Sequence, residues 1–218
     1  MKKILFSVLF TFSSLLIFAQ NDPGPRFKLG LTAHPTFGWL KSDLQDVKND
    51  GLRAGFSYGL IGDFYFSPNY AFSTGIKLST INGQTSVSDF GPANQPIRNN
   101  VYKLQYIEIP AKLKLTTNEI RGNKFYGEFG LGNGFNVSAK LDQKGDNGTI
   151  ITEDRDISKD IAFYRSSLII GAGAEIKLSD KTAVAAGLSY DNGFTNIQSN
   201  GSGKLKNSYL GLNIAVFF

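Results

Sequence analysis

The chain has no cysteine, and it has a single histidine and a single tryptophan among its 218 residues. Without cysteine it can form no disulfide framework, no thiolate metal site and no cysteine nucleophile. Apolar runs long enough for a spanning helix are also missing, because the only sizeable run, Ile4 to Phe18, is too short. The sequence therefore excludes a disulfide-stabilised domain and a helical membrane protein.

Residues 1–19 have the form of a secretory signal peptide. Lys2 and Lys3 give a basic start, and an apolar segment broken only by hydroxyl residues leads to a cleavage point after Ala19. We expect residues 20–218 to remain as one domain, since about 200 residues suit a single all-β domain. Loss of the two lysines leaves 21 basic against 18 acidic residues. That excess of three is too small to indicate a nucleic-acid partner.

The last eleven residues alternate strictly in polarity and end on an aromatic residue, Phe218. Alternation of this length is typical of a β-strand with one apolar face and one mixed face. Bacterial outer-membrane barrels typically end on a strand of this form, so the segment indicates a closed barrel in lipid. The apolar face consists of Leu210, Leu212, Ile214, Val216 and Phe218.

The same two-residue period recurs along the chain and predicts eight strands. Each segment is long enough to cross a bilayer, which takes about 9–11 tilted residues. The mean hydropathy is slightly negative at −0.13, as expected where every second residue avoids lipid. We predict an all-β fold, an eight-stranded antiparallel up-and-down transmembrane β-barrel. The predicted strands are Phe27–Leu40, Arg53–Phe66, Tyr70–Gln84, Val101–Leu115, Lys124–Ser138, Ile161–Leu178, Thr182–Phe194 and Ser208–Phe218.

The connections between these strands alternate in length. Those after the second, fourth and sixth strands are short, whereas residues 41–52, 85–100, 139–160 and 195–205 form long loops. Outer-membrane barrels have this pattern, with short periplasmic turns and longer extracellular loops. Both termini should then face the periplasm, and the protein should lie in the outer membrane after export and signal-peptide cleavage.

Aromatic residues gather near both ends of the predicted strands, as they do at the two interfaces of a membrane. A soluble sandwich with an aromatic core is the competing interpretation, but it leaves the loop lengths and the final Phe218 unexplained. The predicted girdles are Phe64, Phe66, Tyr70, Phe72, Phe125, Phe217 and Phe218 at the short-turn end, and Phe37, Trp39, Phe56, Tyr58, Tyr102, Phe135, Phe163, Tyr190 and Phe194 at the long-loop end.

The faces opposite the apolar ones carry many charges. An eight-stranded barrel has an interior just wide enough to be filled by side chains. Because buried charges must pair, we predict an interior salt-bridge network instead of a conduction path. Glycines on the same faces should leave room for the long side chains. The predicted network consists of Asp63, Lys77, Glu108, Lys112, Lys114, Glu128, Glu175, Lys177 and Asp191.

The segment Tyr106-Ile-Glu-Ile-Pro110, followed by alternating Lys112-Leu-Lys114-Leu, resembles the fourth-strand signature of the PorT-like outer-membrane β-barrel domain family of Gram-negative bacteria. The similarity covers essentially the whole mature chain, although the family usually has more apolar residues where Ala111 and Lys112 stand. The resemblance implies an eight-stranded outer-membrane barrel. The founding members are linked to protein secretion, whereas most relatives have no assigned activity.

Three functional classes remain open: a structural or interaction barrel acting through its long loops, a small pore, and a barrel enzyme acting on lipid or peptide. The charged, filled lumen disfavours a pore. An enzyme would need a Ser-His or Asp-His constellation near the outer rim, and the sole histidine, His34, is better read as an inward polar filler. The acidic loop around Asp142 and Asp154 matches no Ca²⁺ loop spacing. We therefore expect no enzyme activity, no cofactor and no metal.

The expected partners are outer-membrane lipid, the barrel-insertion machinery, and an extracellular or periplasmic protein. The insertion machinery should recognise Phe218 as an assembly signal.

Overall fold

Ten β-strands and no α-helix make up the described part of the chain. The computed structural model describes residues 27–44, 47–87, 98–145, 150–199 and 203–218. Within these ranges no helix has the length and apolar character that crossing a membrane would take. The expected signal peptide lies outside the described residues. The strands are β1 (Phe27–Ser42), β2 (Val47–Asn49), β3 (Arg53–Ser67), β4 (Tyr70–Val87), β5 (Arg98–Thr116), β6 (Asn123–Lys144), β7 (Ile150–Asp156), β8 (Tyr164–Lys177), β9 (Ala183–Gly193) and β10 (Leu205–Phe217).

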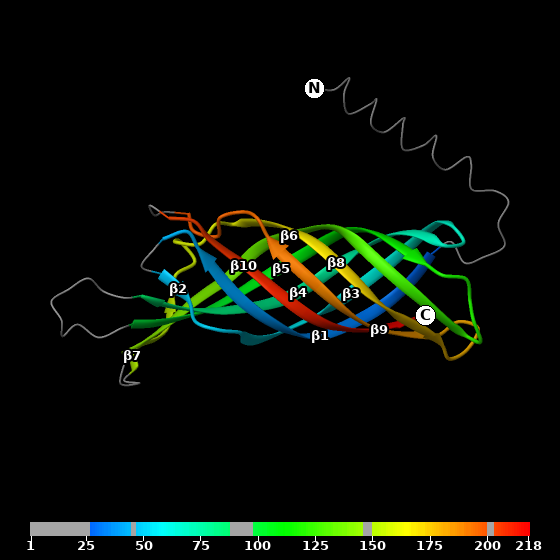
Figure 1. Cartoon of the computed structure of the whole chain (residues 1–218), viewed down its shortest axis with the longest axis horizontal. Coiled ribbons are helices and arrows are strands. Elements are labelled where there is room, and N and C mark those ends of the chain that lie inside the picture. The colour runs from blue at the N-terminus through cyan, green and yellow to red at the C-terminus, as the bar shows by residue number, and fades with distance from the viewer. Residues whose placement is uncertain (1–26, 45–46, 88–97, 146–149, 200–202) are drawn as a thin grey trace, which may run out of the picture.

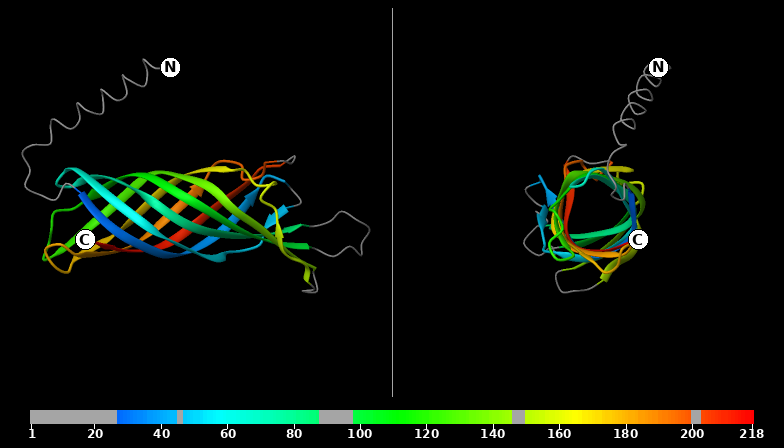
Figure 2. Two further views of the ribbon diagram at one scale, coloured as in Figure 1. Left: turned by 180° about the vertical axis from the view of Figure 1, so that it is seen from behind. Right: turned by 90° about the vertical axis from the view of Figure 1, so that its right-hand side faces the viewer.

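Eight of these strands close into a ring in the order β1-β3-β4-β5-β6-β8-β9-β10, and every neighbouring pair is antiparallel. The ring closes where β1 pairs with β10, from Gly30 opposite Phe217 to Ser42 opposite Leu205. The end-on view in Figure 2 shows the resulting barrel. The predicted eight-stranded antiparallel barrel is confirmed.

The long and short connections segregate to opposite ends of the barrel (Figure 1). Residues 68–69, 117–122 and 178–182 form the turns at one end, which is also the end of the carboxyl terminus. At the other end the chain adds two strands that the sequence interpretation had assigned to loops. Strand β2 pairs with the end of β4, and β7 pairs with the end of β6, so the wall extends on this side.

Two strand prolines interrupt the ladder on one side each. The β1–β10 register passes from Ala33 opposite Ile214 directly to Thr36, so the pairing skips Pro35. The β4–β5 register likewise skips Pro110. Proline has no N–H to donate to a neighbouring strand, and the gaps follow from that. Pairing resumes on both sides of each gap and keeps the barrel closed.

Burial alternates along each strand, as the two-residue period predicts. In β1, for example, Leu31 and Phe37 are exposed on the outer wall while Thr32 and Thr36 are buried inside. The outward residues are large and apolar on every strand of the ring, and they include Leu60, Phe72, Ile107, Phe129, Ile170, Leu188 and Leu212. A protein in water would bury such side chains, so this outer wall fits a hydrocarbon environment.

Candidate functional site: the lumen and its two ends

The lumen is lined by charged side chains that the strand pleat turns inward. Eight of the nine residues predicted for the interior network are buried or nearly so, and each forms an ion pair with a residue of another strand. They are Asp63, Lys77, Glu108, Lys112, Lys114, Glu128, Glu175 and Asp191.

Arg165 of β8 is the centre of the charge cluster nearer the long-loop end. Its side chain is 1% exposed. The guanidinium donates hydrogen bonds to Asp191 of β9, to Asn207 Oδ1 of β10 at 2.5 Å and to Ser167 Oγ at 3.1 Å. It also lies 3.5 Å from Glu108 Oε1 of β5. One side chain thus joins strands from opposite parts of the wall.

Glu108 receives the remaining contacts of this cluster. Its Oε2 accepts hydrogen bonds from Ser79 Oγ at 2.5 Å and from the Tyr209 hydroxyl at 3.2 Å. Lys77 Nζ lies 3.4 Å from the same oxygen. Both carboxylate oxygens are therefore satisfied without water, which a buried charge requires.

A second cluster lies toward the short-turn end and is centred on Lys114. Its ammonium group bonds Asp63 at 2.5 Å and lies 3.5 Å from Glu175, which also pairs with Lys28. It sits over the rings of Tyr126 and Phe217, with 4.9 Å and 4.7 Å to their centroids. These contacts combine charge pairing with cation–π attraction around a buried ammonium group.

Between the two clusters, Lys112 Nζ bonds Glu128 Oε2 at 2.7 Å. Counting this pair, the ion pairs of the lumen join five cations to five carboxylates, so the described network carries no net charge. The positive and negative charges of these ion pairs therefore balance. The cations are Lys28, Lys77, Lys112, Lys114 and Arg165, and the carboxylates are Asp63, Glu108, Glu128, Glu175 and Asp191.

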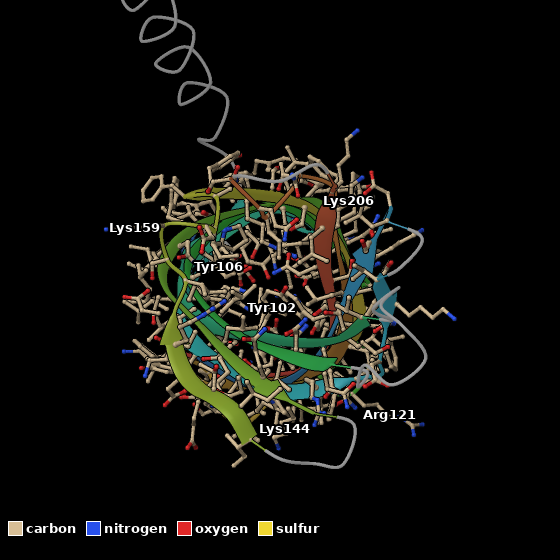
Figure 3. The ribbon with its side chains drawn as sticks, turned by 90° about the vertical axis from the view of Figure 1, so that its left-hand side faces the viewer. Tyr102, Tyr106, Arg121, Lys144, Lys159 and Lys206 are labelled. Carbon is tan, nitrogen blue, oxygen red and sulfur yellow. The ribbon has the colours of Figure 1, made fainter. Side chains whose placement is uncertain are left out.

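Apolar clusters lie inside the barrel toward both ends. At the long-loop end, Ile157, Ile161 and Ile197 come from the loops and pack among inward residues such as Leu40 and Leu104. Figure 3 looks in from this end and shows Tyr102 and Tyr106 lying across the opening. At the short-turn end a smaller cluster fills the lumen, formed by Ala183, Ala185, Ala215 and Phe217.

The space left between these apolar clusters is small. A cavity of about 50 Å³ lies beside His34, Lys112 and Tyr126. It has room for about three or four water molecules, since each needs at least 10–15 Å³. Tyr126 fills the space on the short-turn side of this cavity, where its hydroxyl lies 2.5 Å from where a Cβ would stand at Gly173 and at Gly187. Side chains thus leave little free space beside His34 and Lys112, whereas a larger cavity of about 350 Å³ lies at the short-turn end beside Lys28, Glu175 and Phe217.

His34 lies inside the barrel, 3% exposed, and its Nδ1 has no hydrogen-bond partner in the described part of the chain. It faces the small cavity next to Lys77 and Lys112, away from the outer rim. Among the described residues, no group of His, Cys, Asp or Glu side chains is arranged to hold a metal ion. Asp146 of the acidic loop lies outside the described residues.

Sequence reasoning misplaced one network residue. Lys177 is the last residue of β8, where its side chain is 45% exposed and bonds Asp180 in the following turn at 3.1 Å. The inward phase of β8 continues to this position, but the strand has already reached the rim, so the side chain bends into water. Two of the predicted girdle aromatics are also corrected, because Phe217 and Tyr102 lie inside the barrel.

Two network residues were missed. Arg165 and Lys28 both lie on the inward phase of strands that were recognised, since Lys28 precedes Leu29 and Arg165 is six residues before Gly171. Extending each strand's phase to its ends would have found both.

The remaining aromatic residues of the two girdles lie on the outer wall. At the short-turn end Phe66, Phe125 and Phe218 are 65%, 57% and 59% exposed. Phe218 continues the closing pair of strands, because its N–H donates to the Leu29 carbonyl oxygen at 2.9 Å. Near the other end Trp39 and Tyr190 stack with their ring centroids 6.0 Å apart. Two aromatic belts separated by an apolar wall are the pattern of a membrane barrel.

Among solved structures, Neisserial surface protein A shares this fold. It is 14% identical, with 88% of this chain and 96% of that one aligned at a TM-score of 0.50. The outer membrane protein OprG of Pseudomonas aeruginosa is 8% identical, with 88% and 94% aligned at a TM-score of 0.44. The attachment invasion locus protein Ail of Yersinia pestis is 18% identical, with 88% and 99% aligned at a TM-score of 0.37.

No curated protein matches this sequence. The model of one protein family does match, over residues 18–199, which is most of the chain and includes all ring strands except β10. Together with the closed ring, the apolar outer wall and the paired lumen, this match shows that the chain belongs to the outer membrane protein β-barrel domain family.

Proposed function

We propose that this outer-membrane barrel works through its long-loop end, where it contacts an extracellular protein partner, and that its lumen is a structural core. The observation that carries the proposal is the seal formed by Ile157, Ile161 and Ile197, which pack into the mouth of the barrel over the charge network. An ion-paired lumen that is covered at the long-loop end supports a structural role for the interior over a conduction path.

The long-loop end offers a built surface instead. Strands β2 and β7 widen the wall there, and Lys103 ties β7 to β6 by bonding Asp142 at 2.6 Å and Asp154 at 2.9 Å. Apolar side chains project from this region, with Ile151 53% and Phe163 68% exposed. Ordered, exposed strands with apolar side chains are a common form of protein-binding surface.

Site-specific photo-cross-linking in intact cells tests the proposal. A photoreactive residue at Ile151 of β7 should give a discrete adduct. The same residue at Ile120, which is 58% exposed in a short turn at the opposite end, is the matched control and should not give that adduct. Absence of an adduct from Ile151, or the same adduct from both positions, would contradict the proposal.

A small pore is the alternative function, because eight-stranded barrels enclose an interior with polar lining. Planar-bilayer recordings decide between the two. We expect purified protein to insert without discrete current steps. Reproducible steps that disappear when inserted protein is omitted would favour the pore.

We also propose that the chain is not an enzyme. Its sole histidine is buried beside lysines, out of reach of a substrate at the rim. His34→Ala should leave every cellular phenotype of the barrel intact, whereas loss of a phenotype with normal amounts of folded protein would point to catalysis.

Three further assignments belong to the same proposal. The signal peptide is cleaved after Ala19, which the mass of the purified mature chain tests. Phe218 acts as the signal that the barrel-insertion machinery recognises. Within its family the chain groups with the PorT-like members, supported by the Tyr106-to-Pro110 motif, whose Tyr106 and Glu108 point into the lumen. A chimera carrying this strand from a PorT-like relative should then still fold as a barrel.

A further inference from the structure

The outer wall carries an ordered ladder of residue pairs where the barrel closes. Strands β1 and β10 place Phe37 opposite Leu210 and Trp39 opposite Ser208, and then Lys41 opposite Lys206. All six lie on the outward phase of their strands. Moving toward the long-loop end, the wall thus passes from an apolar pair to the aromatic belt and then to two lysines.

The two lysines stand side by side across the seam. Directly opposed residues on antiparallel strands have Cβ atoms about 4.5–5.5 Å apart, and like charges in this position repel. Among the described residues no carboxylate forms an ion pair with either Lys41 or Lys206. The neighbouring Asp43 is engaged elsewhere, since its Oδ1 accepts the backbone N–H of Lys204 at 2.6 Å.

On the opposite side of the same rim, outward lysines form ion pairs with carboxylates. Lys103 bonds two carboxylates, those of Asp142 and Asp154, and Asp154 also lies 3.5 Å from Lys140. The pairing of Lys41 with Lys206 differs from this arrangement, because it places two positive charges together just beyond the aromatic belt. Lipid headgroups lie at this level of the membrane.

The position of Lys41 and Lys206 along the barrel axis indicates which kind of ligand they could bind. Lys41 lies one outward step, about 7 Å along the strand, beyond Trp39 of the aromatic belt. Aromatic belts mark the boundary between hydrocarbon and headgroups, so the ammonium groups reach the headgroup layer. Figure 3 places Lys206 at the wall of the barrel, away from the lumen. Ammonium groups bind phosphate as point charges, and basic clusters beside a membrane recognise anionic lipids.

We propose that Lys41 and Lys206 together bind the phosphate of an outer-leaflet glycolipid headgroup. The lipid chains would lie along the Phe37–Leu210 step and the sugar against the stacked rings of Trp39 and Tyr190. This rests on the proposed function only in placing the long loops outside the cell. The binding itself is independent of any protein partner.

The sole tryptophan of the chain, Trp39, is a built-in reporter for this site. Purified barrel in an uncharged detergent is titrated with phosphorylated lipid A, and binding is followed by Trp39 fluorescence and by native mass spectrometry. The double variant Lys41→Gln/Lys206→Gln should bind about 30-fold more weakly, because each lysine near a charged surface contributes about a fivefold factor. Lys41→Arg/Lys206→Arg should keep most of the affinity.

The control variant Lys144→Gln/Lys159→Gln removes two exposed charges from the same end, away from the belt. Its affinity should stay within about twofold of the unmodified protein. Equal weakening in both double variants would overturn the site in favour of general attraction. So would equal affinity for lipid A stripped of phosphate. Binding of phosphatidylglycerol as tightly as lipid A would overturn the assignment to an outer-leaflet glycolipid. Since no partner protein is present, failure of this test leaves the cross-linking result at Ile151 unaffected.

Discussion

Arg165 is the side chain on which the outer charge cluster depends, because it alone faces both Asp191 and Glu108. Removing one partner of a buried ion pair leaves an uncompensated charge and costs about 3–5 kcal/mol. Arg165→Met should therefore lower the free energy of unfolding by about that amount, measured by urea titration of the refolded barrel in vesicles.

A second substitution should restore much of this loss. Arg165→Met/Asp191→Asn removes the stranded charge of Asp191, while Glu108 keeps Lys77, Ser79 and Tyr209 as partners. If the double variant is no more stable than Arg165→Met, the loss comes from packing and not from charge.

Glycines of the wall predict a contrast between two neighbouring positions. At Gly173 a Cβ would lie 2.5 Å from the Tyr126 hydroxyl and press on the backbone carbonyl of Ala186, so Gly173→Ala should cost about 1–3 kcal/mol. At Gly127 nothing lies within 4 Å, and Gly127→Ala should change stability by less than about 0.5 kcal/mol. Equal stability of the two variants in urea would show that the lumen is looser than described.

On the outer wall, a charged substitution at a single residue should destabilise the barrel. Ile170 is 53% exposed on the outer wall, midway along β8. Ile170→Arg should cost about 2–4 kcal/mol, the cost of an arginine at the bilayer midplane. Ile170→Leu is the matched control. Tolerance of the arginine in vesicles would mean that this face does not meet hydrocarbon.

At the scale of single elements, β7 depends on the charges of Lys103. The hydrogen bond from Lys103 holds the pKa of the Asp154 carboxyl below its usual range. The bonds to Asp142 and Asp154 raise the pKa of Lys103. Because the pKa of Asp154 is lowered, its ion pair stabilises the docked β7 fully at pH values above the ordinary carboxyl pKa near 3.8. This stabilisation is lost as the pH falls through the lowered pKa. Because the pKa of Lys103 is raised, the contribution of Lys103 persists at high pH until the pH rises through that raised pKa.

Strand β7 should therefore stay docked at neutral pH and loosen in strong acid. Because the chain has no cysteine, Ile151→Cys gives a unique site for a spin label on β7. The mobility of the label should rise as the pH falls below the ordinary carboxyl pKa of 3.8. In a Lys103→Gln background it should be high at every pH. A label that is equally immobile in both proteins would show that backbone pairing alone holds β7.

The closing strand β10 carries the proposed assembly signal. Phe218 is 59% exposed and adds one backbone hydrogen bond, so its deletion should cost no more than about 1.5–3 kcal/mol. The truncated chain should still refold in detergent. In cells it should accumulate in the periplasm or be degraded, as fractionation would show. Normal outer-membrane levels would contradict the role of Phe218 as an insertion signal, and Phe66→Ala, which removes a more exposed ring at the same end, controls for lost burial.

How much the sequence predicts differs among the elements. The predicted bounds of the ring strands agree with the structure to within three residues, because lipid outside and a polar lumen inside impose strict alternation. The exception is β6, which continues six residues past the predicted end at Ser138. Strands β2 and β7 were missed because both faces of each meet water, so a segment such as Glu153-Asp-Arg-Asp156 has no alternation to detect. The interior charges were predicted from strand phase, but their pairing was not. Which lysine meets which carboxylate depends on the stagger of strands around the ring, and a single sequence does not contain this.

The molecule as a whole is a ring without an edge, and this closure predicts its resistance to detergent. The β1–β10 pairing completes the ring from Gly30 to Ser42, so the backbone groups of the wall find partners within the barrel. SDS should not unfold it at room temperature, and the unboiled protein should migrate faster in a gel than the boiled protein. A chain ending at residue 204, before β10, cannot close and should migrate identically in both conditions. If the complete chain also shows no shift, the seam does not form a stable closure, and the extra pairing gap at Pro35 is the first place to look. In that event Pro35→Val, which restores a backbone N–H facing β10, should bring the shift back.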